Sequence, residues 1–394
     1  MGATSSTRSA RIDALRGLAV FGILLINVWG FVYGYTALRY GVIDASATSG
    51  DRLAVFFAAA FAEQKFYPIF AFLFGAGFSL QMRSLAAKSG LDEARAVYLR
   101  RLKWLLVVGL LHGALLWFGD ILTAYALTGF WLLRRAGESW PDIRKSIRLA
   151  VIVNVGVLLL TAVIMATIAN MSEYGTESAA EALLANDIYA QGGWIEVAQA
   201  RIRDFGMNIS GFWLFVPRIA LLFLLGVTAV QLGWLTHPER HRALWRRILL
   251  AGVFIALPLN VWWGYEALSW ALEPDMSSRS VHMASFVLEL AGPALAAAYV
   301  ALFMLAGERV MSAVASWLAP VGRMALTNYL MQSVVCGLLL QTYGLGLGAV
   351  LSRAHLMSVC AGIMLAQIVS SRWWLARHDQ GPAEALWRRY TYRS

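Results

Sequence analysis

Residues 100–120 read RRLKWLLVVGLLHGALLWFGD, an apolar run that begins with cations, contains one histidine and ends on a carboxylate. The run predicts a membrane-spanning helix. Placing Asp, Lys or Arg at bilayer depth costs roughly 2.5 to 3.5 kcal/mol, whereas histidine can stay uncharged at neutral pH. His112 is therefore either a group with a chemical role or a partner in an interhelical hydrogen bond that only fixes packing. Both interpretations stay open at this point.

The composition of the whole chain is that of a membrane protein. Of the 394 residues, 59% are hydrophobic and only 14% are charged, whereas soluble domains have about 25% charged residues. The net charge of +10 comes from short clusters between apolar runs, so we predict no nucleic-acid partner. The two cysteines lie within apolar runs and indicate neither a disulfide framework nor a thiolate metal site. No metal site is predicted.

We predict an all-α polytopic membrane protein with about ten transmembrane helices. A helix needs about 20 mostly apolar residues to cross the hydrocarbon, and about ten stretches of the chain come close to this length. The predicted spans are 16–34, 53–81, 101–118, 120–133, 148–169, 211–234, 247–269, 283–306, 321–341 and 349–371.

The connectors between these spans alternate in charge. Every second connector is basic, and the others are mostly neutral or acidic. Cytoplasmic loops carry the excess of Lys and Arg, so both termini are expected in the cytoplasm. We predict an N-terminal helical half (1–170, about five spans) that holds the active site, and an external loop (171–210). A C-terminal half (211–394, about five spans) with a basic cytoplasmic tail would follow. The loop, with a break at its two adjacent glycines, either caps a site from outside or lies on the surface as an amphipathic linker.

The first span carries polar residues at two depths. Arg16 lies at the cytoplasmic mouth, and Asn27 lies roughly 16 Å deeper along a helix. One interpretation is structural: Asp13 and Arg16 pair across one helical turn, and Asn27 ties helices together. The other places Asn27 in an active-site layer.

The second span carries Glu63 and Lys65, which point to different sides of a regular helix and so need separate partners. Both lie at a depth similar to that of Asn27 and His112, which predicts one polar layer. Pro68 predicts a kink close to them.

Asp120 is eight residues after His112, about 12 Å away on a continuous helix and too far for a hydrogen bond. It either caps the next helix or, if the chain turns sharply at Gly119, swings back over the site.

Further polar residues lie in the C-terminal half. His282 opens the eighth span near the outer face. The ninth span contains Arg323 and, four residues apart, Asn328 and Gln332, which predict a polar stripe facing into the bundle. No nucleotide-binding, metalloprotease or serine-hydrolase motif occurs, so ATP-driven transport, nucleotide redox chemistry and serine hydrolysis are unsupported.

Five segments in order carry a family resemblance: RIDALRGLAVFGILLIN, EQKFYPIFAFLFGAGF, RRLKWLLVVGLLHGALLWFGDILTAYAL, GRMALTNYLMQS and GPAEALWRRYTY. Together they resemble the YeiB-type bacterial membrane proteins, whose C-terminal half is a domain of unknown function. That family is placed in a transmembrane acyltransferase superfamily with the acyltransferase-3 enzymes and the heparan glucosaminide N-acetyltransferase. Acyltransferase-3 proteins end a similar first span with a catalytic histidine, where this chain has Asn27. The glucosaminide acetyltransferase resembles this chain better but has its histidine before the second span, where residues 35–52 contain none. His112 is then the best remaining base.

The resemblance implies transfer of an acyl group from cytoplasmic acyl-CoA to an unknown acceptor at the outer side of the membrane. Acyl-CoA would be a co-substrate, and no tightly bound cofactor is expected. His112 would take the acceptor's proton or carry the acyl group, oriented by Glu63 or Asp120, with Lys65 or Asn27 steadying the oxyanion. The CoA phosphates would be held by four cations: Arg16, Arg100, Arg101 and Lys103.

The alternative is a proton-coupled transporter or a lipid- or solute-binding protein, with Glu63, Lys65 and His112 as a gate. The lipid bilayer is a partner in either case. Whether the chain forms a homo-oligomer is left open by the sequence.

Overall fold

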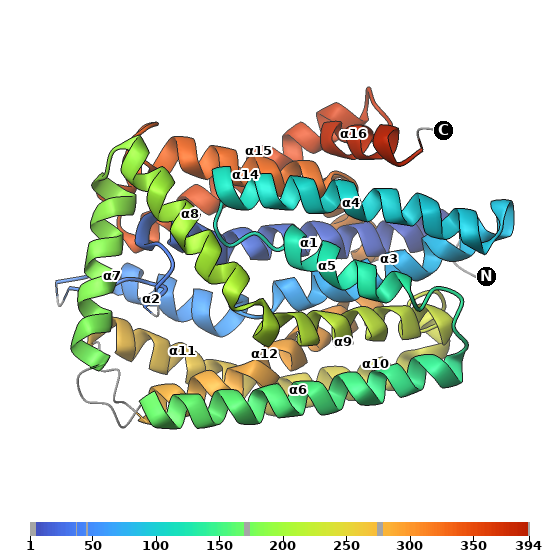
Figure 1. The fold of residues 1–394 in the computed structure, drawn as a ribbon, viewed down its shortest axis with the longest axis horizontal. Coiled ribbons are helices and arrows are strands. Elements are labelled where there is room, and N and C mark those ends of the chain that lie inside the picture. Colours follow the sequence, from blue (N-terminus) through green and yellow to red (C-terminus); the bar gives the residue numbers. More distant parts are fainter. Residues whose placement is uncertain (1–4, 37, 45, 169–173, 274–278, 393–394) are drawn as a thin grey trace.

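The computed structural model describes residues 5–36, 38–44, 46–168, 174–273 and 279–392, and this part of the chain contains helices and no strand. Most helices run along the long axis of one bundle, and α7 crosses one of its ends (Figure 1). The helices are α1 (Ser5–Tyr33), α2 (Ser49–Phe57), η1 (Ala58–Ala62), α3 (Phe66–Ser89), α4 (Leu91–Leu115), α5 (Leu122–Leu133), α6 (Trp140–Ile168), α7 (Tyr174–Gln191), α8 (Trp194–Ser210), α9 (Phe212–Gln231), η2 (Pro238–His241), α10 (Arg242–Ala251), η3 (Gly252–Ala256), α11 (Leu257–Leu272), α12 (Arg279–Leu305), α13 (Glu308–Arg323), α14 (Ala325–Leu340), η4 (Leu347–Ala349), α15 (Arg353–Leu375) and α16 (Pro382–Thr391).

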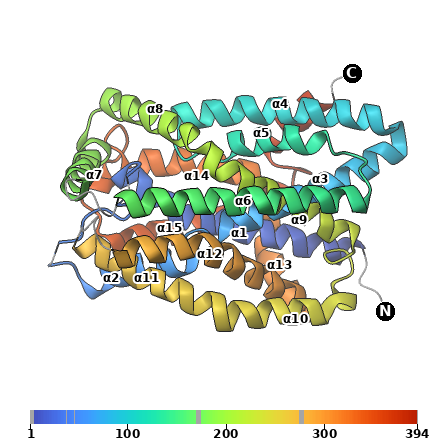
Figure 2. The same ribbon diagram turned by 60° about the horizontal axis from the view of Figure 1, so that its bottom comes forward.

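The predicted class, an all-α polytopic membrane protein, is confirmed. Within the described residues, seven helices are long and apolar enough to cross a membrane, and α5 and α14 are shorter apolar helices. Each of the ten predicted spans falls largely on a helix or on a broken helix. The N-terminus of α1 and the C-terminus of α16 lie at the same end of the bundle (Figures 1 and 2). Ten crossings and cytoplasmic termini stay predictions, and the predicted boundary at residues 170–171 lies outside the described part of the chain.

Two predicted spans are interrupted. The second consists of α2, the π-helix η1 and α3, and the backbone breaks at Glu63–Lys65 rather than at Pro68. Gln64 adopts a left-handed conformation with φ of 60°, which ends the helical hydrogen-bond ladder there. The ninth, predicted as 321–341, is broken at Met324, so its first residues belong to the separate helix α13, which was not predicted.

The predicted external segment contains α7 and α8, separated at Gly192 and Gly193 as expected. α8 lies against α4, with the Phe205 ring over Gly113, where no larger residue would fit. The segment therefore packs against the bundle through α8, and its two predicted roles, a cap over a site or a surface linker, stay predictions.

Close helix contacts depend on small residues. α3 and α9 touch backbone to backbone, because a Cβ at Gly75 or Gly226 would overlap a carbonyl of the other helix. In a bilayer, helix association depends on such van der Waals packing, since lipid tails are as apolar as the side chains they replace. Gly77, two residues after Gly75, instead borders a cavity that opens toward α16.

The last helix holds the start of α14. Glu384 of α16 accepts hydrogen bonds from the backbone N–H groups of Leu326 and Thr327, at 2.8 and 3.1 Å, and from the Thr327 hydroxyl. Free N–H groups in the first turn of a helix need such acceptors, and a carboxylate there also complements the helix dipole. Residues 58 positions apart in the sequence are thus joined at one helix end.

We expect Gly226→Leu to destabilise the bundle by several kcal/mol, because the new side chain would have to force α3 and α9 apart. The melting temperature of the detergent-purified protein measures this. Gly156→Leu on α6 is the matched control, since a Cβ at Gly156 meets nothing within 4 Å. Equal melting temperatures for the two variants would contradict the close contact.

Candidate functional site

The site is built on a chain reversal between α4 and α5. α4 ends at Leu115, where the N–H groups of Leu116 and Trp117 both donate to the His112 carbonyl, and α5 begins at Leu122. The reversal returns Asp120 to His112, and the distance between Nδ1 and Oδ1 is 2.8 Å. Both predicted arrangements of Asp120 are observed, the sharp turn back to His112 being one of them. The second Asp120 oxygen accepts from the backbone N–H and the hydroxyl of Thr123, so this carboxylate also caps α5.

The other imidazole nitrogen of His112 contacts α14. Its Nε2 lies 2.8 Å from the Ser333 hydroxyl oxygen. An ionised carboxylate only accepts hydrogen bonds, so Asp120 favours the tautomer with the proton on Nδ1, and Nε2 then accepts from Ser333. His112, Asp120 and Ser333 are all at least 96% buried. The Tyr329 ring lies one helical turn before Ser333, with its centroid 5.0 Å from that of the imidazole.

α8 satisfies backbone carbonyls that the reversal leaves free. Arg201 donates to the Leu115 carbonyl and, at 2.8 Å, to Gln341 of the α14 end. Asn208 donates to the Phe118 carbonyl at 3.1 Å. Unpaired carbonyls at this depth would be costly, so α8 stabilises the turn that carries Asp120.

A cavity of about 460 Å³ lies beneath α8, and we call it the α8-side cavity. Asp120 and Tyr329 form part of its wall, and Asn208 lies at the α8 end. It brings together eight charged or amide side chains: Asn27, Arg39, Glu63, Gln64, Asp120, Asn208, Arg218 and Glu289.

A second cavity of about 430 Å³ opens toward α16, and we call it the α16-side cavity. Its lining is basic and aromatic. Arg101 stacks on Trp387 with its guanidinium carbon 3.6 Å from the ring centroid, and Arg323 donates to the Asp379 carbonyl at 3.0 Å. The four arginines of the lining are Arg16, Arg101, Arg323 and Arg388.

The two cavities share three lining residues, Ile23, Ile121 and Tyr329. These side chains therefore form part of the wall between the α8-side cavity and the α16-side cavity. The His112–Asp120 pair lies at this wall, because Asp120 borders the first cavity and the Tyr329 ring contacts the imidazole.

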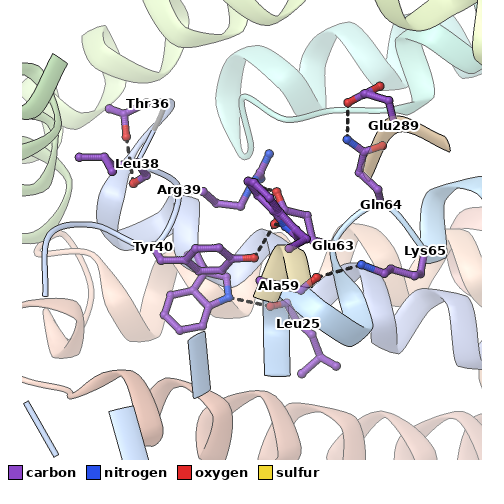
Figure 3. Close-up of polar contacts among 12 residues, drawn as sticks. Leu25, Thr36, Leu38, Arg39, Tyr40, Ala59, Glu63, Gln64, Lys65 and Glu289 are labelled. Atoms are coloured by element: carbon purple, nitrogen blue, oxygen red, sulfur yellow. Dashed lines mark hydrogen bonds and ion pairs between the residues drawn. The ribbon is translucent and has the colours of Figure 1, made fainter. Parts of the chain in front are cut away.

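The helix break at Glu63–Lys65 sends three polar side chains to separate partners (Figure 3). Glu63 accepts from Arg39 at 3.0 Å, from the Tyr40 hydroxyl at 2.7 Å and from the Trp263 ring N–H at 2.9 Å. Burial and the neighbouring carboxylate raise the pKa of Tyr40 well above its ordinary value, so the phenol stays protonated and donates.

Lys65 is fully buried and donates to the Ala59 carbonyl at 2.9 Å. The predicted polar layer is thus divided. Asn27, Glu63 and Asp120 share the α8-side cavity, His112 lies behind its wall, and Lys65 lines neither of the two cavities.

The other predicted residues are dispersed. Arg16 pairs with Asp13 at 2.8 Å, as expected for a spacing of three, and still borders the α16-side cavity with Arg101. Arg100 instead donates to the Thr391 carbonyl at 3.0 Å, and Lys103 is exposed. Neither lines this cavity, because the helical period turns them away from Arg101.

The predicted polar stripe of α14 is buried and links helices. Asn328 donates to the Val321 carbonyl and to Ser371, and Gln332 donates to Gln367 at 2.9 Å. His282, near the start of α12, borders neither cavity.

Several site residues were not among those predicted: Arg39, Arg218, Glu289, Tyr329, Ser333 and Arg388. Arg218 and Glu289 each stand within a long apolar run, and an isolated charge in such a run is a signal that could have identified them. Ser333 carried no comparable signal, because its role depends on the contact between α4 and α14. Among the described residues, no group of three or more His, Cys, Asp or Glu side chains could hold a metal ion.

Comparison with known proteins gives relatives over the whole length of the chain. Residues 229–394 match the family described as a protein of unknown function, DUF418. The chain is 30% identical to the uncharacterised protein YxaH of Bacillus subtilis, over 99% of the chain and 96% of YxaH. It is 32% identical to the uncharacterised protein YeiB of Escherichia coli, over 98% of the chain and 97% of YeiB. No solved structure matches. With this identity over nearly the full length of both relatives, the chain belongs to the YeiB and YxaH family of proteins.

Proposed function

We propose that this protein is an integral-membrane acyltransferase of the bacterial inner membrane. It would move an acyl group from cytoplasmic acyl-CoA to an acceptor at the outer side. The observation that supports this most is the buried Asp120–His112–Ser333 chain, which lies at the wall between a cationic cavity and a polar cavity. A reaction that joins substrates from opposite sides of a membrane needs such a wall.

The α16-side cavity is the proposed donor site. Guanidinium groups bind phosphate oxygens in pairs, and Arg16, Arg101 and Arg388 from three different helices border this space. The Trp387 ring, already stacked under Arg101, adds an aromatic face of the kind on which a nucleotide base stacks. The thioester end of the donor would then point toward Tyr329 and the wall.

The chemical step assigns His112 as general base. Asp120 holds the Nδ1 proton, which leaves Nε2 free to take a proton from the acceptor hydroxyl or amine once that group replaces Ser333. The acceptor atom attacks the thioester carbonyl, the carbon–sulfur bond breaks, and the CoA thiolate takes the proton from His112. Rotation of Tyr329 is the movement that would open Nε2 to the cavities. Asn27, across the α8-side cavity, is the proposed donor to the oxyanion.

We expect His112→Ala to lower acyl transfer by about 10²- to 10⁴-fold, the usual contribution of a general base. Membrane insertion and melting temperature should be retained. Asp120→Asn should also lower the rate of transfer, because the amide no longer favours the proton on Nδ1. The exposed His355→Ala is the matched control. Full transfer by His112→Ala would refute the assignment of the base.

Donor binding is tested by calorimetry with acetyl-CoA and a longer acyl-CoA. Loss of a charge-assisted contact costs about 1.5–3 kcal/mol, so Arg16→Ala and Arg388→Ala should each weaken binding by about 10- to 100-fold. The exposed Arg246→Ala, which borders neither cavity, should bind as the unchanged protein does. Absence of binding to any acyl-CoA, together with proton-gradient-dependent solute flux in sealed vesicles, would favour the transporter alternative.

A further inference from the structure

A third cavity, of about 410 Å³, has no part in the chemistry described above, and we call it the apolar cavity. Its walls come from α3, α6, α9, α10 and α12 and are almost entirely aliphatic and aromatic. Leu290, which is 59% exposed, and the exposed Ala294 lie at its rim on α12. α6, at the edge of the bundle in Figure 1, carries exposed Ile152 and Leu159. The cavity therefore lies on a face that contacts lipid tails.

The apolar cavity meets the α8-side cavity at one ion pair. Arg218 of α9 and Glu289 of α12 line both cavities and contact each other. Arg218 also donates to the Gln64 amide oxygen at 3.2 Å and to the Tyr67 hydroxyl at 3.3 Å. Gln64, from the helix break, donates to Glu289, as Figure 3 shows. A polar network thus separates an apolar space from a polar one.

Backbone geometry keeps this network in place. Gly292 lies one helical turn after Glu289, and a Cβ there would come within 2.8 Å of the Gln64 Cβ. Only glycine lets α12 approach the break this closely. The left-handed Gln64 is held against Glu289 and Arg218, although residues other than glycine rarely adopt such a conformation.

We infer that the acceptor is a membrane lipid with an anionic, hydroxyl-bearing headgroup. This inference rests on the proposed acyltransferase function. The lipid tail would occupy the apolar cavity, and the headgroup would pass Arg218 into the α8-side cavity, with its hydroxyl toward Asp120 and His112. A soluble acceptor has no apolar tail that could occupy an aliphatic cavity next to the polar one.

The charges of the polar cavity are compatible with this headgroup. Arg218 offers a planar fork of donors that fits a phosphate, and Gln64 already supplies Glu289 with a second donor if the arginine changes partner. Glu63 is paired with the cation Arg39, and the Asp120 carboxylate is engaged in hydrogen bonds with His112 and Thr123.

The test uses phosphatidylglycerol with a photoreactive group in its tail, at low density in phosphatidylcholine nanodiscs, without acyl donor. Crosslinks should concentrate on the lining of the apolar cavity. Ala294→Phe should reduce them roughly tenfold by filling the space. The same substitution at the exposed Ala361 of α15, which borders none of the three cavities, should not. Arg218→Gln should remove the preference for phosphatidylglycerol over a phosphatidylcholine probe while tail crosslinks remain.

Crosslinking is read without any transfer reaction, so it separates this inference from the proposed function. His112→Ala should crosslink as the unchanged protein does. Crosslinks spread evenly over all lipid-facing helices, or unaffected by Ala294→Phe, would overturn the lipid acceptor even if acyl-CoA binds. Specific crosslinks without acyl-CoA binding would support the lipid site and refute the acyltransferase.

Discussion

The hydrogen bond between His112 Nδ1 and Asp120 Oδ1 depends on a buried reversal of the chain between α4 and α5, and much of the surrounding structure stabilises that reversal. Two residues eight apart can meet only if the helix ends between them, and a buried helix end leaves carbonyls that need other donors. Arg201 and Asn208 of α8 supply the missing donors, and Thr123 shares the Asp120 carboxylate. Helix α8, the reversal and the buried imidazole therefore form one unit.

Irregular backbone is concentrated around the two cavities. Three interruptions lie there: the reversal between α4 and α5, the break at Glu63–Lys65 and the break at Met324. Each frees backbone or side-chain groups that a continuous helix would keep paired, and each is satisfied from a distant part of the chain. Non-helical backbone at this depth is tolerated where it lines a cavity or is buried in protein. The positions of the breaks thus coincide with the proposed site independently of any titratable residue.

Much of the architecture was predictable because the bilayer imposes a length and a polarity on every span. The ranges of the helices, the helical external segment and the Asp13–Arg16 pair follow from local rules of spacing. His112 and Asp120 were recognisable as unusual, but their contact depends on a turn whose geometry the spacing does not determine. The His112–Ser333 contact and the Arg218–Glu289 pair each join residues more than 70 positions apart. Lys103 was predicted to bind phosphate beside Arg101 but does not line the same cavity, because only the packed structure shows which face of α4 meets α16. Contacts between distant helices decide the site, and no local pattern encodes them.

The place of α16 bears on how this protein is handled in the laboratory. Its Glu384 secures the first turn of the helix that bears Tyr329 and Ser333, and its Trp387 and Arg388 face the cationic cavity. The polar end of the chain looks like a dispensable tail in a hydropathy plot, and it is where an affinity tag or a reporter fusion would ordinarily be attached. In this fold such an addition would sit beside the cationic cavity, and trimming the tail would uncap α14. Inactive preparations of a tagged or shortened protein would then reflect a displaced helix rather than a missing activity.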